Sequence, residues 1–178
     1  MNRKTPHTAV VAIPPENLWD PIQRIRSQYD RHVDRWMPHV TLVYPFRPRE
    51  EFDAAAQALA KASAGVVPFE VSLADVKFFE HGPGRFTIWM APEPAAPIVD
   101  MQAVLARPFP DCDDVARYAS GFTPHLSVGQ ADGRQALEER MARIRSGWIP
   151  LQFPVREVAL IAREGDAPFR VERTFPLG

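Results

Sequence analysis

Hydrophobic residues along the chain follow two periods in turn, one typical of strands and the other of helices. An apolar run over 7–13 ends at Pro14-Pro15, which predicts a strand closed by two prolines. A helix is predicted over about 16–31, because its apolar residues recur every three or four positions (Leu18, Ile22, Ile25 and Tyr29). A second strand over 39–44 and a second helix over about 52–62 follow.

The remainder of the chain continues this alternation. Strands over 69–79 and 85–91 are predicted to form a hairpin across a Gly-Pro-Gly turn, and a helix follows around 98–105. A strand over about 122–130 and a helix around 137–144 come next, before two closing strands over about 151–163 and 169–175. The succession predicts an α/β protein of the α+β kind.

The two halves of the chain share one pattern. In each, a helix is followed by Pro-His-x-(Thr or Ser) on a strand, then by another helix and a strand that opens with Phe-x-Val. The motif over 38–41 thus corresponds to that over 124–127. No Gly- or Ser-rich linker separates the halves, so we expect a single domain over 1–178 with two pseudo-twofold lobes around a central cleft.

Composition narrows the classes of function. The 178 residues carry a formal net charge of −1, which argues against duplex DNA or an anionic membrane as the partner and makes a monomer the default. Cys112 is the one cysteine, so the sequence predicts no disulfide, no structural zinc or iron–sulfur site, and a cytoplasmic location. Its neighbours Asp111 and Asp113 disfavour a reactive thiolate.

The paired motifs are the candidate active site. Side chains alternate along a strand, so His39 and Thr41 should share one face, and His125 and Ser127 should do the same. Two imidazoles around one cavity suit phosphodiester hydrolysis without a metal or other cofactor, because one can deprotonate the nucleophile while the other protonates the leaving oxygen. The hydroxyls would stabilise charge on the phosphate. Either histidine could be the acid.

These motifs resemble those of the two-histidine (2H) phosphoesterase superfamily, which includes 2'-5' RNA ligases and RNA 2',3'-cyclic phosphodiesterases. The segments over 8–14 and 84–89 resemble the family's first and mid-chain strands, so the resemblance covers nearly the whole chain. It implies a bilobal fold, catalytic His39 and His125, and phosphate ligands Thr41 and Ser127. It also implies a nucleotide or RNA terminus with a cyclic or 2'-linked phosphodiester as substrate, with ligation as the reverse reaction.

Many RNA-processing members of that superfamily continue the second motif with a basic residue, which this chain lacks. Arg163 is a candidate replacement, because it ends a strand much as Phe79 does in the first half; Lys77 and Arg85 are alternatives. Three aromatic residues are candidates for stacking on a base: Trp36, Phe46 and Phe122.

The other histidines, His7, His32 and His81, lack a hydroxyl partner two residues on within a strand and are expected at the surface, and Trp19 and Trp89 are expected in the core. Two rival interpretations remain. The cleft could bind nucleotides or RNA ends without turnover, or the paired histidines could be structural, in which case replacing them would lower stability and leave activity unchanged.

Overall fold

The computed structural model describes residues 3–118 and 120–178 and contains two four-stranded antiparallel sheets. The first sheet has the order β2-β1-β7-β8, with bounds Val40–Val43, Thr8–Ala12, Glu157–Ala162 and Arg170–Pro176. The second sheet has the order β5-β4-β3-β6, with bounds Leu126–Asp132, Arg85–Glu93, Phe69–Glu80 and Leu151–Val155. The predicted α+β class is confirmed.

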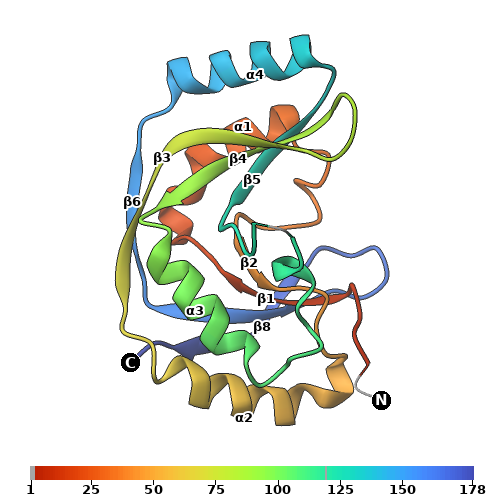
Figure 1. The fold of residues 1–178 in the computed structure, drawn as a ribbon, viewed down its shortest axis with the longest axis vertical. Helices are drawn as coiled ribbons and strands as arrows, with labels where there is room; N and C mark the ends of the chain where they lie inside the picture. Colours follow the sequence, from red (N-terminus) through yellow and green to blue (C-terminus); the bar gives the residue numbers. More distant parts are fainter. Residues whose placement is uncertain (1–2, 119) are drawn as a thin grey trace.

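Four α-helices within the described residues cover the sheets. Helices α2 (Phe52–Ser63) and α3 (Ala96–Ala106) pack on the first sheet, and α1 (Trp19–Tyr29) and α4 (Arg134–Gly147) pack on the second. Short 3-10 turns lie at Glu16–Leu18, Arg49–Glu51 and Asp114–Ala116. Figure 1 shows α4 at one end of the long axis and α2 at the other, with the strands between them. Each sheet with its helices forms one lobe.

The segment over 151–163 differs from its prediction as one strand. It forms two strands in different sheets, because β6 pairs with β3 while β7 pairs with β1 and β8. Phe153 and Val155 are buried in the main core, and so are Val158 and Leu160, so the alternation shifts by one residue at Arg156. The Arg156 carbonyl accepts a 2.8 Å hydrogen bond from the N–H of Leu177 where the chain crosses over.

The two Phe-x-Val segments pair directly with each other. Phe69 lies opposite Val155 and Val71 lies opposite Phe153 on antiparallel β3 and β6, an arrangement that a local twofold axis would produce. Strand β3 of the first half lies beside β4 in the second sheet, and the chain after β6 continues as β7, which lies beside β1 in the first sheet. Because each sheet is made from both halves, we infer that the halves form one unit.

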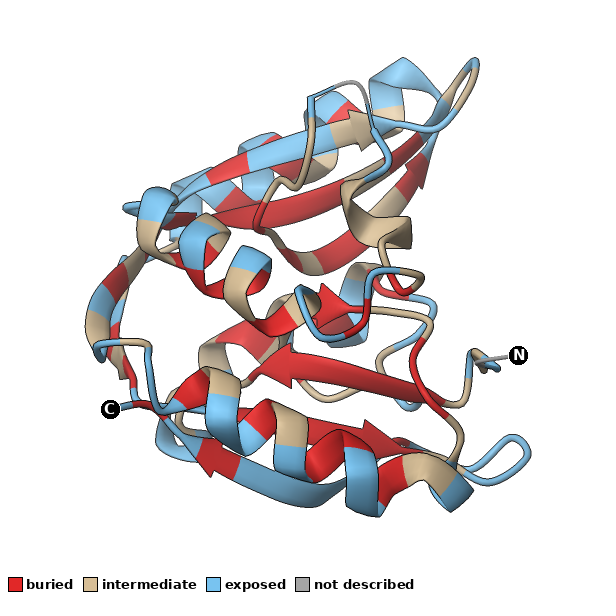
Figure 2. Cartoon of the chain, turned by 60° about the horizontal axis from the view of Figure 1, so that its bottom comes forward, coloured by how far each residue is buried: buried red, intermediate tan, exposed pale blue. Residues whose placement is uncertain are grey.

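Most buried apolar residues belong to one cluster between the sheets and the helices that cover them. Figure 2 shows the buried positions concentrated on the central strands and the exposed positions on the outward sides of the helices and on loops. A second, smaller cluster lies on the other face of the first sheet and contains Ala9, Val11, Ala159, Ile161 and Phe169. The candidate site residues of the first half lie on this second face.

Candidate active site

Each motif lies where a strand begins. His39 and His125 immediately precede β2 and β5. The apolar residues that follow each histidine, Val40 and Leu126, are buried in the main core, whereas the hydroxyl residues Thr41 and Ser127 are half-buried. The structure therefore confirms the predicted alternation, with histidine and hydroxyl facing away from the main core.

A β-bulge follows the hydroxyl residue of each motif. Thr41 lies opposite Val11 on β1, but Val43 lies opposite Val10, so Leu42 is the extra residue. Ser127 lies opposite Trp89 on β4, but Gly129 lies opposite Ile88, so Val128 is the extra residue. Bulges are common beside active sites, where they redirect side chains. Their matching positions show that the halves correspond in backbone geometry as well as in sequence.

The two motif histidines make equivalent hydrogen bonds. Nδ1 of His39 lies 2.6 Å from the carbonyl oxygen of Met37, and Nδ1 of His125 lies 2.8 Å from that of Thr123. Because a carbonyl oxygen only accepts, each Nδ1 must carry the proton and donate it. The neutral imidazole then has an unprotonated Nε2, the form needed to accept a proton from a nucleophile.

Burial lowers the pKa of both motif histidines, since the charged imidazolium loses hydration. The pKa of His39 falls to about 4; the Met37 carbonyl opposes this shift, while the charges of Arg26 and His125 add to it and that of Asp30 opposes it. For His125 the Thr123 carbonyl opposes the shift and His81 adds to it.

Aromatic rings surround His39. Trp36 stacks on the imidazole with ring centroids 4.8 Å apart, and Phe169 stacks on Trp36 at 3.8 Å. The guanidinium of Arg163 lies 5.5 Å from the centroid of Phe169 and donates to the Gly165 carbonyl. The Nε of Arg163 is buried without a hydrogen-bond partner among the described residues. Arg163 thus lies on the His39 side of the site, in contact with Phe169.

A different aromatic pair surrounds His125. Phe79 meets the imidazole edge to face at 5.0 Å and stacks on Trp89 at 4.6 Å. Trp89 is buried, as predicted, but it contacts the motif histidine, and its Nε1 has no hydrogen-bond partner among the described residues. Lys77, opposite Trp89 on β3, lies near carboxylates of Asp75 and Glu93 at 3.9 and 3.7 Å.

The pairing of the strands shows that Arg163 does not correspond to Phe79, as the sequence had suggested. The N–H of Arg163 donates to the His7 carbonyl just beyond the β1–β7 ladder, and the N–H of His81 donates to the Arg85 carbonyl just beyond the β3–β4 ladder. His81, one position after β3, is therefore the counterpart of Arg163. Arg85 itself is exposed, and its guanidinium donates to the His81 carbonyl.

The three aromatic residues proposed to stack on a base lie in different places. Phe46 is fully buried against Phe109 in the main core, so the interpretation of Phe46 as a base-stacking residue is wrong. Phe122 is partly buried against the same core. Trp36 remains beside His39. The Cys112 thiol is buried, which raises its pKa to about 11, in keeping with an unreactive thiol.

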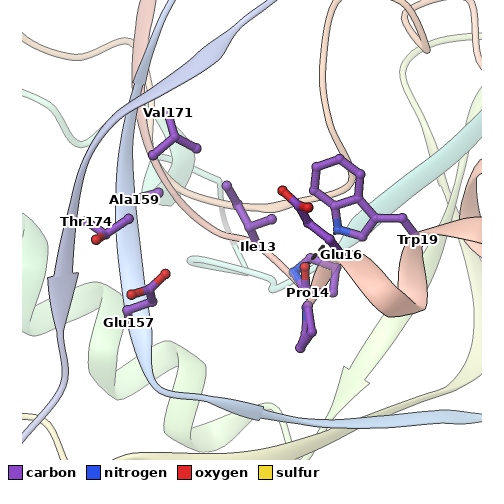
Figure 3. A pocket seen from close by; sticks show the side chains of 9 residues that line it. Ile13, Pro14, Glu16, Trp19, Glu157, Ala159, Val171 and Thr174 are labelled. Atoms are coloured by element: carbon purple, nitrogen blue, oxygen red, sulfur yellow. Dashed lines mark hydrogen bonds between the residues drawn. The ribbon is translucent and has the colours of Figure 1, made fainter.

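One pocket lies at the second motif and another lies over the first sheet. One of about 220 Å³ includes His125 in its wall together with Phe79, His81, Tyr118 and Thr123. The other, of about 230 Å³, lies over the first sheet and is bordered by Trp19 and by two carboxylates (Figure 3). Its lining residues are Ile13, Pro14, Pro15, Glu16, Trp19, Glu157, Ala159, Val171 and Thr174, without His39.

No group of three or more His, Cys, Asp or Glu side chains suited to a metal ion is found over 3–118 and 120–178. Within the same residues, no helix has the length and apolar character to cross a membrane.

Sequence reasoning missed several residues that support the site. The buried Arg26–Asp30 ion pair acts on the pKa of His39, and Gln102 of α3 donates to the carbonyl of Leu42, the bulged residue after Thr41, at 3.3 Å. His81 was expected at the surface; it is exposed, but it also lines the pocket at His125. A polar residue on the apolar stripe of its helix, as at Arg26, is the signal that could have identified such a support.

The two-lobed α+β fold with a His-x-(Thr/Ser) motif in each lobe defines a class of phosphoesterase-like proteins. A family model described as the 2'-5' RNA ligase superfamily matches residues 14–167, so the chain belongs to that family. A relative from Halalkalibacterium halodurans named "Putative phosphoesterase" is 26% identical over 171 residues, covering 95% of this chain and 96% of the relative. A Geobacillus kaustophilus relative of the same name is 31% identical over 122 residues, covering 68% and 67%.

Solved structures share the fold. The apo form of E. coli LigT has a TM-score of 0.64 at 14% identity, covering 98% of this chain and 99% of that one. LigT with 3'-AMP has a TM-score of 0.64 at 15% identity, covering 96% and 97%. LigT has also been crystallised with NADP+ and ATP. The predicted membership and the predicted fold are thereby confirmed.

Proposed function

We propose that the chain is a metal-independent phosphoesterase that hydrolyses 2',3'-cyclic or other 2'-linked phosphodiesters of nucleotides or RNA termini. His39 and His125 are its acid and base. The observation that carries the proposal is the matched tautomer of the two imidazoles, each with Nδ1 tied to the carbonyl two residues earlier. Family membership and the nucleotides bound to the structural relative LigT support the same class of substrate.

The reaction needs one neutral and one protonated imidazole. The neutral imidazole accepts a proton at Nε2 from a water molecule, whose oxygen attacks phosphorus. The bond from phosphorus to the ribose oxygen breaks, and the protonated imidazole gives its proton to that leaving oxygen. The two histidines have then swapped protonation states, and proton transfer with solvent restores the starting form. When a ribose 5'-hydroxyl takes the place of water as the nucleophile, the same sequence opens a 2',3'-cyclic phosphate to a 2'-5' phosphodiester and a free 3'-hydroxyl, which is the ligation reaction.

Thr41 and Ser127 are proposed as phosphate ligands. Both lie on the face of their motif histidine and are only half-buried, so their hydroxyls can donate to non-bridging oxygens. Arg163 is proposed as a further phosphate ligand, on the strength of its buried, unpartnered Nε and its place on the His39 side. Replacing Thr41 by Val or Ser127 by Ala should lower kcat by about 10²-fold or more.

The experiment follows the four nucleoside 2',3'-cyclic monophosphates with purified protein in excess EDTA. Wild type should convert them, and His39→Ala and His125→Ala should each lose roughly 10²–10⁴ in rate. His32→Ala, which changes an exposed histidine outside the motifs, is the matched control. Melting curves of all variants separate a catalytic loss from a folding defect.

Turnover that survives either motif substitution within a factor of a few, or that EDTA abolishes, would contradict the proposal. Binding of a cyclic nucleotide that is recovered unchanged after long incubation would support a binding module in its place. A large drop in melting temperature with unchanged activity would identify structural histidines.

A further inference from the structure

The pseudo-twofold relation between the lobes breaks down beside the two motif histidines. The register makes Phe79 the counterpart of Ile161, since the former lies opposite Thr87 and the latter opposite Ala9 on equivalent strands. It likewise makes His81 the counterpart of Arg163. Equivalent backbone positions therefore carry different side chains around His39 and His125.

In the first lobe, side chains fill the space beside the histidine. Trp36 lies nearly parallel to His39, with an interplanar angle of 18°. Phe169, from the segment before β8, stacks on Trp36 with an interplanar angle of 26°. Phe169 is buried, and it belongs to the cluster that also contains Ile161. Trp36 therefore occupies one face of the His39 imidazole.

In the second lobe, the corresponding space is a pocket. Phe122 occupies the sequence position equivalent to Trp36, but it packs against the main core. A pocket of about 220 Å³ lies there, and its lining includes His125, Phe79, Tyr118, Ser120 and Thr123. Tyr118 is 68% exposed, so its ring is accessible to a ligand in this pocket.

We propose that this pocket, bounded by Phe79, His81, Tyr118, Thr123 and His125, binds the base of the nucleotide. The inference rests on the proposed function, which places the phosphate at the two motif histidines. Aromatic side chains stack on bases, and hydroxyl and imidazole groups can hydrogen-bond their edges. Its volume is below the roughly 300–1,000 Å³ of pockets for drug-sized ligands, so it suits one base and not two.

The test measures binding, so it does not depend on turnover. Titrations of adenosine 3'-monophosphate and of inorganic phosphate, followed by NMR, give the ratio of the two affinities for each variant. Ser120→Trp places an indole at the pocket, and Tyr118→Ala removes one of its two aromatic lining residues besides the histidines. Val171→Trp is the matched control, because it fills the pocket over the first sheet.

We expect the preference of wild type for the nucleotide over phosphate to fall about tenfold or more in Ser120→Trp and in Tyr118→Ala. Tyr118→Phe and Val171→Trp should retain it, and inorganic phosphate should bind all five proteins alike. Melting temperatures close to that of wild type establish that the variants are folded.

Three results would overturn the inference: an unchanged preference in Ser120→Trp, a loss of preference in Val171→Trp instead, or equal affinity of wild type for nucleotide and phosphate. Failure of the proposed function gives a different signature, since wild type would then show the expected binding pattern without converting cyclic nucleotides.

Discussion

The Nε of Arg26 donates a 2.8 Å hydrogen bond to Oδ2 of Asp30, and both side chains are almost fully buried at the end of α1. Oδ1 of the same carboxylate accepts hydrogen bonds from the N–H of His32 at 2.9 Å and from the side chain of Gln130 at 3.1 Å. Gln130 belongs to β5, the strand of the second motif. The ion pair thus links α1 of the first half to that strand, and both of its charges act on the pKa of His39.

Replacing Arg26 by Met should destabilise the protein by about 3–5 kcal/mol, because the Asp30 carboxylate would remain buried without its counter-ion. Urea denaturation measures this loss. The substitution also removes a positive charge that lowers the pKa of His39, so that pKa should rise. NMR titration of the His39 ring reports the second effect.

The control is the double variant Arg26→Met/Asp30→Asn, which removes both charges and keeps an amide that can accept from His32. It should recover much of the stability lost by the single variant. Equal losses in the single and double variants would mean that an uncompensated charge is not the cause.

Stability should fall as pH falls from about 6.5 to about 4. The folded-state pKa of His39 lies near 4, below the ordinary value of 6.5, so the unfolded chain binds a proton in this range that the folded chain does not. The neutral imidazole therefore contributes stability above pH 6.5 that is lost as pH decreases, by up to about 3 kcal/mol. Urea midpoints of wild type and His39→Gln across this range should converge at low pH; parallel curves would contradict the prediction.

The pH dependence of kcat/KM should be bell-shaped, with its maximum on the acid side of neutrality. This parameter reports the pKa values of the free enzyme, and burial lowers those of both motif histidines. The form with one neutral and one protonated imidazole is then most populated between about pH 4 and 6.5. Initial rates with a cyclic mononucleotide from pH 4 to 9 test this, and a maximum above pH 7 would exclude it.

His81→Gln provides a control for that profile. The charge of His81 adds to the lowering of the pKa of His125, so its removal should raise that pKa. The limb of the profile assigned to His125 should move to higher pH, while the limb assigned to His39 stays in place.

The catalytic candidates were predictable because they are repeated. A lone His-x-Thr carries little information, but the matching contexts of His39 and His125 include the residues that fix the strand and its buried face. Arg26 and Asp30 have no such counterpart in the second half. Their contact with the second motif depends on how α1 packs against β5, which no local pattern reveals.

The passage of the chain from one sheet to the other at Arg156 shows a second limit of prediction from sequence. The segment from 151 to 163, apolar apart from a few positions such as Arg156 and Glu157, predicts one strand, and its counterpart β3 is in fact continuous over Phe69–Glu80. The one-residue shift of the buried positions between Val155 and Val158 was present in the sequence, but its meaning depends on two sheets sharing one core. Local periodicity identifies strands and leaves their sheet unassigned.

Gly129, the residue after the bulge in the second motif strand, should tolerate no side chain. A Cβ added there would lie 2.6 Å from Cβ of Tyr29 and 3.1 Å from its carbonyl oxygen, at the end of α1. Backbone atoms lie on both sides of this contact, so relief requires α1 or β5 to shift. Gly129→Ala should therefore destabilise the protein by about 1–3 kcal/mol, as measured by thermal or urea unfolding.

The same shift would displace Ser127 and His125, which lie just before Gly129 on the chain. We expect kcat to fall with cyclic nucleotides even at temperatures where the variant is fully folded. Gly147→Ala is the matched control, because a Cβ at the end of α4 meets no atom within 4 Å. It should leave kcat unchanged and stability unchanged or raised by about 0.4–1 kcal/mol. Equal stability and activity of the two variants would show that the approach of α1 to β5 does not position the second motif.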